Sequence, residues 1–169
     1  MIRQAIAEDL EDIMIMIHDT VTIMQTEGNN QWSEVYPVRE DFLQDIAQGA
    51  LYVYCDEHNK PQGVVCLNDQ QLEAYAPLAW QLKAPAMVIH RLAVAPQARR
   101  QGIGTKLMRF AEDLASQRGF KQMRTDTYHC NERMQALFQK MGYKKVGECY
   151  FVEDLAAFYC YEKLLGPAV

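Results

Sequence analysis

The segment with the clearest chemical meaning is Arg99-Arg100-Gln101-Gly102-Ile103-Gly104-Thr105. It lies between an apolar run, Met87 to Val94, and a helical pattern that starts at Ile103. The first N–H groups of a helix have no partner within the helix and carry partial positive charge, so they can bind a phosphate group. Glycines let such a ligand approach the backbone, and two arginines add charge. The segment therefore predicts a phosphate-binding loop. The alternative is a plain helix start, with glycines for turning and arginines for solubility.

Two common nucleotide-binding signatures do not match this segment. A P-loop ends in Gly-Lys-Ser/Thr, whereas the order here is Gly104-Thr105-Lys106. The dinucleotide fingerprint needs a third glycine at the position that Leu107 occupies. Both signatures are therefore excluded, and the phosphate must belong to another kind of ligand.

A different pattern does match, namely Arg/Gln-x-x-Gly-x-Gly/Ala after a strand that ends in Val-x-Pro. It is met by Arg99-x-x-Gly102-x-Gly104 after Val94-Ala95-Pro96. A second element is Asn131 followed by Ala136-Leu137-Phe138-x-Lys140-x-Gly142-Tyr143. In order and spacing, the two elements resemble the GNAT superfamily of acyl-CoA-dependent N-acetyltransferases. The resemblance covers the whole layout of the chain, although residues 1–85 match only in the order of their elements.

The resemblance implies that acetyl-CoA binds along the central strand and the loop that follows it. The amides from about Arg100 to Thr105 would bind the pyrophosphate, and Leu92 and Val94 would pair through their backbones with the pantetheine arm. Asn131 would contact the same arm, although asparagine is also one of the best N-cap residues and both roles can coexist. The expected cofactor-binding residues are Leu92, Val94, Arg99, Arg100, Gln101, Gly102, Ile103, Gly104, Thr105, Asn131 and Phe138.

Proton transfer is the part of the chemistry for which the usual residues are missing. An ammonium group with a pKa of about 10.4 lies roughly 4.6 kcal/mol from its neutral, attacking form at pH 7. Relatives often place a glutamate where this chain has Val88, and a tyrosine that protonates the departing thiolate where it has Phe138. Neither valine nor phenylalanine can carry a proton.

Other side chains could take these roles. His90 lies two residues after Val88 on the same face of the strand, and an ordinary pKa near 6.5 suits a base at neutral pH. A histidine hydrogen-bonded inside the sheet is the alternative. Tyr128 and His129, at the end of the next expected strand, are other proton carriers. By the resemblance, the amide of Leu92 would bind the developing oxyanion.

The amine acceptor is expected to enter near the loop between the first two helices. Trp32 and Tyr36 lie in that loop and could form an apolar wall for the acceptor, or could cover the core. The net charge of −5 slightly favours a cationic acceptor, but global charge says little about one pocket.

The elements in the first half of the chain follow from hydrophobic spacing. Residues 1–5 predict a short strand, and Asp9 is placed to cap a helix. A second helix is expected over 40–48, and a hairpin over 51–55 and 63–67, whereas residues 70–85 show no clear period. The apolar stripe of the first helix consists of Leu10, Ile13, Met14, Ile17, Val21 and Met24.

The second half predicts alternating strands and helices. A buried strand over 87–94 precedes a helix from Ile103, for which Gly119 is the left-handed terminator. A strand over 121–127, a helix ending at Gly142 and strands near 144–152 and 157–165 complete the chain. Together with the resemblance, this order predicts an α/β (α+β) fold over 1–169, a single domain with a mixed, mostly antiparallel central sheet flanked by helices.

Composition excludes several other classes of protein. The chain of 169 residues has a net charge of −5, which disfavours binding to a nucleic-acid backbone. No apolar run approaches the roughly 18 residues that span a bilayer, and acidic residues occupy the place of a signal peptide's apolar centre. We therefore expect a cytoplasmic protein that does not enter a membrane. Five cysteines without CxxC spacing predict reduced thiols and no metal site.

These observations predict an N-acetyltransferase that moves an acetyl group from acetyl-CoA to a primary amine. The amine would attack directly in a ternary complex, its identity (small molecule or peptide) is open, and the protein could be a homodimer. The alternative is a catalytically weak acyl-CoA-binding sensor or interaction module of the same fold.

Overall fold

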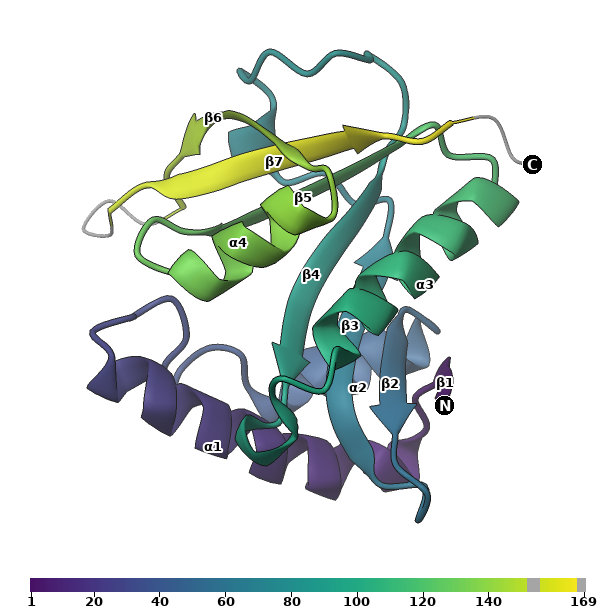
Figure 1. Ribbon diagram of the computed structural model, residues 1–169, viewed down its shortest axis with the longest axis vertical. Helices are drawn as coiled ribbons and strands as arrows, with labels where there is room; N and C mark the ends of the chain where they lie inside the picture. Colours follow the sequence, from purple (N-terminus) through teal and green to yellow (C-terminus); the bar gives the residue numbers. More distant parts are fainter. Residues whose placement is uncertain (152–155, 167–169) are drawn as a thin grey trace. The chain divides into compact units, whose positions relative to one another are not determined.

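The computed structural model describes residues 1–151 and 156–166, in which the strands and helices follow one another in the order that the spacing predicts (Figure 1). Short 3-10 turns lie at Ala7–Asp9, Glu73–Tyr75 and Pro96–Ala98. The regular elements are β1 Ile2–Gln4, α1 Leu10–Thr26, α2 Arg39–Ala47, β2 Leu51–Cys55, β3 Pro61–Asn68, β4 Met87–Val94, α3 Ile103–Gln117, β5 Gln122–Tyr128, α4 Glu132–Lys140, β6 Lys144–Cys149 and β7 Phe158–Leu164.

The strands follow the order β1-β2-β3-β4-β5-β7-β6. The pair β4–β5 is parallel, whereas β1–β2, β2–β3, β5–β7 and β6–β7 are antiparallel. The predicted fold class, a mixed and mostly antiparallel sheet with flanking helices, is confirmed.

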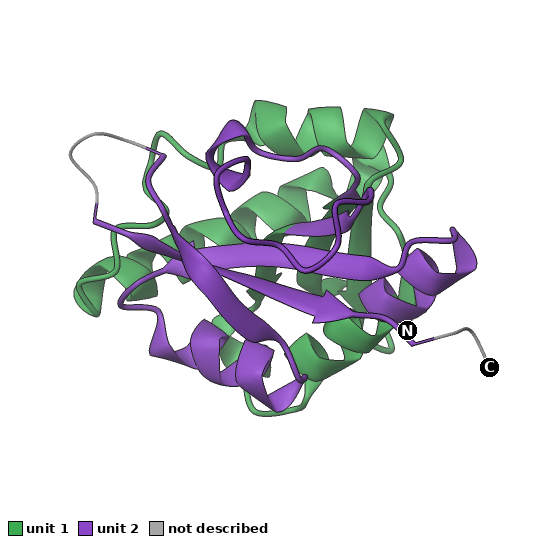
Figure 2. Ribbon diagram, turned by 90° about the horizontal axis from the view of Figure 1, so that it is seen from above, with its two compact units in different colours: residues 1–67, 90–110 green, residues 68–89, 111–169 purple. Residues whose placement is uncertain are grey.

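The chain divides into two compact units, drawn in different colours in Figure 2. Unit 1 consists of residues 1–67 and 90–110, and unit 2 of residues 68–89 and 111–169. The strand β4 and the helix α3 each contribute residues to both units.

The predicted cap at Asp9 and the predicted end of the strand near 144–152 differ from the structure. Asp9 precedes α1, but its side chain makes no capping bond to that helix, so the predicted cap is wrong. The Asp9 carboxylate instead accepts the N–H of Ile6 at 2.8 Å and pairs with Arg3 at 2.7 Å. The strand expected near 144–152 ends at Cys149, and its last expected residue, Val152, lies outside the described residues.

Unit 1 contains a buried ion pair between β4 and α2. The guanidinium of Arg91 donates to both carboxylate oxygens of Asp45, at 2.7 and 2.5 Å, and to the hydroxyl of Tyr36 at 3.2 Å. The two charged side chains are only 15% and 5% exposed. Burial alone would lower the pKa of Arg91, but the Asp45 carboxylate outweighs it and the net pKa is raised. Arg91 also has a φ of 47°, so the ion pair holds a left-handed residue within the strand.

Unit 2 builds its sheet from β5, β7 and β6, with different coverings on its two faces. One face carries Thr125 and Tyr161, which are register partners, and Phe138 of α4 packs on Tyr161 with 5.2 Å between ring centroids. The other face carries Gln122, Arg124, Asp126 and Tyr128. The β3–β4 connection covers it, because Gln122 and Arg124 both donate to the carbonyl oxygen of Leu82. We call this second side the loop-covered face.

All five cysteines are free thiols, as expected from their spacing. Cys149 and Cys160 are buried in unit 2 with their sulfur atoms 2.8 Å apart. In the described part of the chain, no helix has the length and apolar character needed to cross a membrane.

Replacing Asp45 tests how much the buried ion pair contributes to the free energy of unfolding. Asp45→Asn leaves the Arg91 guanidinium buried without its counter-charge, so we expect the free energy of unfolding to fall by about 3 kcal/mol. Urea unfolding followed by circular dichroism measures this loss. Glu11→Gln removes an exposed ion pair with Arg39 and serves as control, because solvent screens that pair and its loss should be small by comparison. Equal effects of the two variants would contradict the assignment.

Candidate functional site: an anion-binding loop and a buried carboxyl group

The loop between β4 and α3 has two left-handed residues in close succession. Arg100 has a φ of 65° and Gly102 a φ of 74°. The first bond into the helix runs from the N–H of Lys106 to the carbonyl of Gly102, at 3.0 Å. Within residues 1–151 and 156–166, the backbone N–H groups from Gly102 to Thr105 make no hydrogen bond. They form the row of unpaired donors that the sequence predicted.

Packing of α3 on β3 fixes the position of this row of donors in unit 1. Ile103 is buried at the first turn, and a Cβ atom placed on Gly63 would lie 3.0 Å from its Cγ2 atom and 3.0 Å from Cδ1 of Leu107. A side chain at this position would make tight contacts with both, so glycine lets the helix lie close to the strand. Sequence reasoning treated Gly63 simply as the start of a strand and missed this role, because no local pattern marks the contact.

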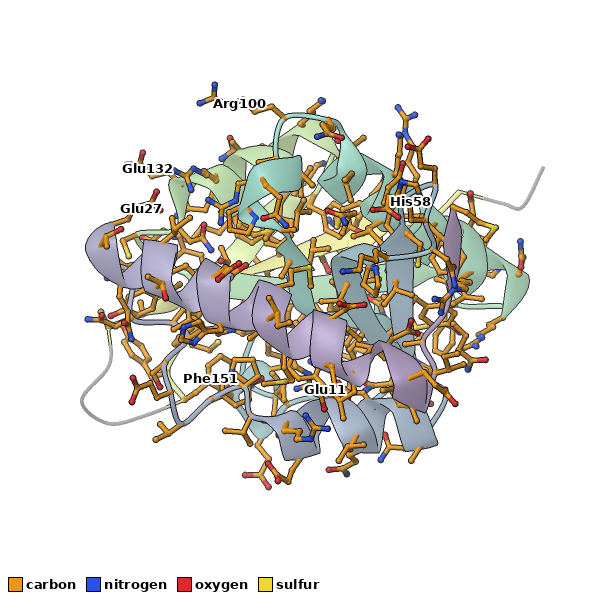
Figure 3. All side chains as sticks on the ribbon, turned by 90° about the horizontal axis from the view of Figure 1, so that it is seen from below. Glu11, Glu27, His58, Arg100, Glu132 and Phe151 are labelled. Atoms are coloured by element: carbon orange, nitrogen blue, oxygen red, sulfur yellow. The ribbon has the colours of Figure 1, made fainter. Side chains whose placement is uncertain are left out.

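The space in front of the loop is open. Gly102 is exposed, and a Cβ atom placed on it would meet no protein atom within 4 Å. Arg100 is exposed, and Figure 3 shows its side chain extending away from the ribbon. Unpaired N–H groups, a helix N-terminus and a nearby guanidinium suit an anion with several oxygens, so the loop fits a pyrophosphate group.

The other predicted residues of unit 1 differ in their exposure. On β4, Leu92 is buried, whereas His90 and Val94 are half-buried. Trp32 is 6% exposed and belongs to the core of unit 1, which favours the covering role. Tyr36 is 42% exposed, and its hydroxyl accepts a hydrogen bond from Arg91.

The predicted residues of unit 2 are packed or capping. The side chain of Asn131 accepts the N–H of Met134 at 3.3 Å, so its role as N-cap is confirmed. Phe138 is 1% exposed and packs against Tyr143 and Tyr161. Tyr128 is buried in a cluster with Tyr75, Val88, Cys149, Phe158 and Cys160.

A carboxyl group that sequence reasoning missed lies next to this cluster. The hydroxyl of Tyr75 donates to Asp126 at 2.5 Å, and the two residues are 51 positions apart in the chain. Burial raises the pKa of Asp126 to about 6, while the hydrogen bond from Tyr75 opposes the rise. The available signal was an aspartate in a mostly buried strand whose only other charged residue is Arg124, since buried strands rarely carry a carboxylate.

The next feature is the arrangement of the side chains that could bind a metal ion. Among the residues that the structure describes, no three His, Cys, Asp or Glu side chains are grouped as metal ligands would be.

Comparison with known proteins shows the family to which this chain is similar. Residues 17–143 match the family model of the acetyltransferase (GNAT) family. The N-acetyltransferase YesJ of Bacillus subtilis (strain 168), itself uncharacterised, is 23% identical over 168 residues, covering 94% of this chain and 87% of YesJ.

Two solved structures share the fold over nearly their whole length. A GNAT-family acetyltransferase from Streptococcus agalactiae 2603 has a TM-score of 0.85 and 25% identity, with 97% of this chain and 94% of that chain covered. A Staphylococcus aureus Mu50 protein assigned as an acetyltransferase has a TM-score of 0.77 and 31% identity, with coverage of 98% and 99%.

The chain belongs to the acetyltransferase (GNAT) family. It is therefore an enzyme of the acyltransferase class, as the two sequence elements indicated.

The raised pKa of Asp126 predicts a pH dependence of stability. The folded state holds this proton up to about pH 6, whereas the unfolded state releases it near 3.8, the ordinary pKa of an aspartate. Stability therefore falls as pH rises between these values, by about 2 to 3 kcal/mol. Asp126→Asn cannot titrate, so this part of the decline should disappear from denaturant unfolding curves recorded between pH 4 and pH 7.5. Asp113→Asn, at an exposed position in the same unit, should keep it. An unchanged decline in Asp126→Asn would contradict the raised pKa.

Proposed function

We propose that this enzyme transfers an acetyl group from acetyl-CoA to a primary amine, which attacks directly in a ternary complex. The observation that carries the proposal is the row of unpaired N–H groups from Gly102 to Thr105, with open space in front of Gly102. Family membership narrows the anion to the pyrophosphate of CoA. When bound, acetyl-CoA supplies the acetyl thioester.

In this proposal the protein binds the cosubstrate mainly through backbone groups. The amides of residues 100–105 hold the pyrophosphate, and Arg99 and Arg100 add positive charge. Leu92 and Val94 pair with the pantetheine arm in the manner of an added strand. Asn131 contacts the same arm in addition to capping α4, and Phe138 contributes apolar surface at the position that it shares with relatives.

Proton transfer is proposed to use side chains other than the usual glutamate and tyrosine. His90 and Tyr128 stay the residues that the sequence offers for this role. Because a thiolate with a pKa of about 8.5 is a fair leaving group, the absence of a hydroxyl at Phe138 does not prevent transfer. Most of the rate acceleration then comes from holding the two substrates together and from the amide of Leu92 at the developing oxyanion.

The acceptor is proposed to be a primary amine, a small molecule or a peptide N-terminus or lysine. Tyr36, which is exposed and held by Arg91, is the better placed of the two aromatic residues for contact with it, because Trp32 is buried. We place the reaction in the cytoplasm, where acetyl-CoA is available, and propose no nucleic-acid or membrane partner.

Turnover tests the proposed reaction directly. The purified protein is incubated with acetyl-CoA and a panel of primary amines, and free CoA is measured with a thiol reagent. We expect amine-dependent release of CoA, with an equal amount of N-acetylated product by mass spectrometry. Tight binding of CoA without release for any amine would contradict the proposal and indicate an acyl-CoA-binding module.

A matched pair of glycine variants tests the loop. Gly102→Val fills the space in front of the amides, so we expect CoA affinity to fall at least tenfold, about 1.4 kcal/mol, in titration calorimetry. Gly119→Val is the control, because Gly119 also has a left-handed φ, of 81°, and open space around it, but follows α3. Both variants should lose a similar amount of stability through backbone strain, about 1 to 2 kcal/mol. Wild-type CoA affinity in a folded Gly102→Val protein would exclude the loop as the binding site.

A further inference from the structure

The valine that replaces the usual glutamate shares a sheet face with a carboxylate. Val88 of β4 pairs with Arg124 of β5 in a parallel register, so the two side chains lie on the same face. Asp126 follows Arg124 by two residues and therefore also lies on this loop-covered face. Tyr75 contacts both Val88 and Asp126, because it packs with Val88 in one cluster and its hydroxyl donates a hydrogen bond to the Asp126 carboxylate.

Tyr75 is itself held in place. It is 1% exposed, and its backbone carbonyl accepts the indole N–H of Trp80 at 2.8 Å. The two rings lie 5.2 Å apart between centroids. A hydroxyl on such a fixed ring holds the carboxylate of Asp126 in one orientation, as a reacting group requires.

Asp126 has no counter-ion in the part of the chain that the structure describes. Arg124, the nearest cation on its face, donates to Gln71 and Leu82 and lies over the ring of Trp80. Besides Arg124, the titratable groups on this face are the Tyr75 hydroxyl, the thiol of Cys160, which is the register partner of Asp126, the thiol of Cys149, and the carboxyl group of Glu162, which is the register partner of Arg124. Tyr75 and Cys160 are neutral at pH 7, because burial raises the pKa of Tyr75, and the hydrogen bond with Cys149 together with burial raises the pKa of Cys160.

An uncompensated, half-buried carboxylate costs folding free energy, and a cationic ligand would relieve that cost. Asp126 is half-buried, so part of the residue is exposed to solvent. A primary ammonium group supplies both the charge and the hydrogen-bond donors that the free lone pairs of the carboxylate lack.

We infer that Asp126, positioned by Tyr75, binds the ammonium group of the acceptor and takes its proton, the role that Val88 cannot fill. This inference rests on the proposed function and identifies a proton acceptor different from His90 and Tyr128.

The step balances in atoms and charge. One proton moves from the ammonium nitrogen to a carboxylate oxygen of Asp126, which leaves a neutral amine and a neutral carboxyl group. The nitrogen lone pair forms the C–N bond to the acetyl carbon while the C–S bond breaks and sulfur keeps the electron pair. The second proton on nitrogen passes to sulfur, so that the products are the acetamide and the thiol, and Asp126 returns its proton to solvent.

Tyr75 is a positioning residue in this scheme. Its hydrogen bond stabilises the ionised form of Asp126 and so opposes the effect of burial on the pKa. Removing the hydroxyl should raise the pH above which Asp126 can accept a proton, without removing the carboxylate itself.

The pH profile of kcat/KM tests the inference, measured with one amine that the wild-type protein acetylates. We expect Asp126→Asn to lower kcat/KM by about 10²- to 10⁴-fold and to remove the acidic limb of the profile, with CoA affinity unchanged. Tyr75→Phe should keep the acidic limb but move it to higher pH. Glu162→Gln is the matched control, a buried carboxylate on β7 that accepts the N–H of Gln81, and should leave the profile as it is.

The variants also separate this inference from its alternatives. Full activity with an unchanged acidic limb in Asp126→Asn would overturn the inference and leave the proposed function intact. Loss of the acidic limb in His90→Ala, with the limb retained in Asp126→Asn, would assign the base to His90. If Asp126→Asn does not fold, Tyr75→Phe decides the question. An acidic limb at the same pH in Tyr75→Phe as in the wild-type protein would overturn the inference. Absence of turnover in the wild-type protein would instead reject the proposed function itself.

Discussion

The close packing of α3 on β3 is the contact on which the anion-binding loop depends. Gly63 lets Ile103 and Leu107 lie directly against the strand, and this packing fixes the first turn of the helix. Arg100 and Gly102 then take left-handed conformations so that the chain can leave β4 and enter that turn. No backbone hydrogen bond is donated by the N–H groups from Gly102 to Thr105 in the part of the chain that the structure describes. They are the groups that we propose bind the pyrophosphate of CoA.

The two units differ in whether their buried charged side chains have a counter-charge. In unit 1, Arg91 and Asp45 form a bidentate pair, which satisfies both groups and holds a left-handed residue in β4. In unit 2, Asp126 receives one hydrogen bond from a neutral hydroxyl and no cation among the described residues. A buried charge with its counter-charge stabilises one conformation, whereas a carboxylate without one can accept a cationic ligand, which is the role that we propose for Asp126.

The loss of the usual glutamate and tyrosine has a consistent physical explanation. Val88 and Phe138 are both buried in apolar surroundings, where a charged or hydroxyl-bearing side chain would need new partners. Phe138 packs against the rings of Tyr143 and Tyr161. The neighbouring strand β5 provides a carboxylate on the face that Val88 leaves apolar. This carboxylate is the group to which we assign the proton transfer that Val88 cannot perform.

The sequence by itself determined the order of elements, the fold class and the position of the glycine-containing loop before α3. These features depend on residues close together in the chain, such as Arg99, Gly102 and Gly104, whose spacing is readable because a helix start uses consecutive amides. Only the tertiary structure decided that Gly63 admits Ile103, that Asp45 pairs with Arg91, and that Tyr75 holds Asp126. The partners in each case are 40 or more positions apart, the last pair 51. Residues 70–85 show no periodicity because side-chain contacts with β5 hold them in place, and such contacts leave no repeating pattern in the sequence.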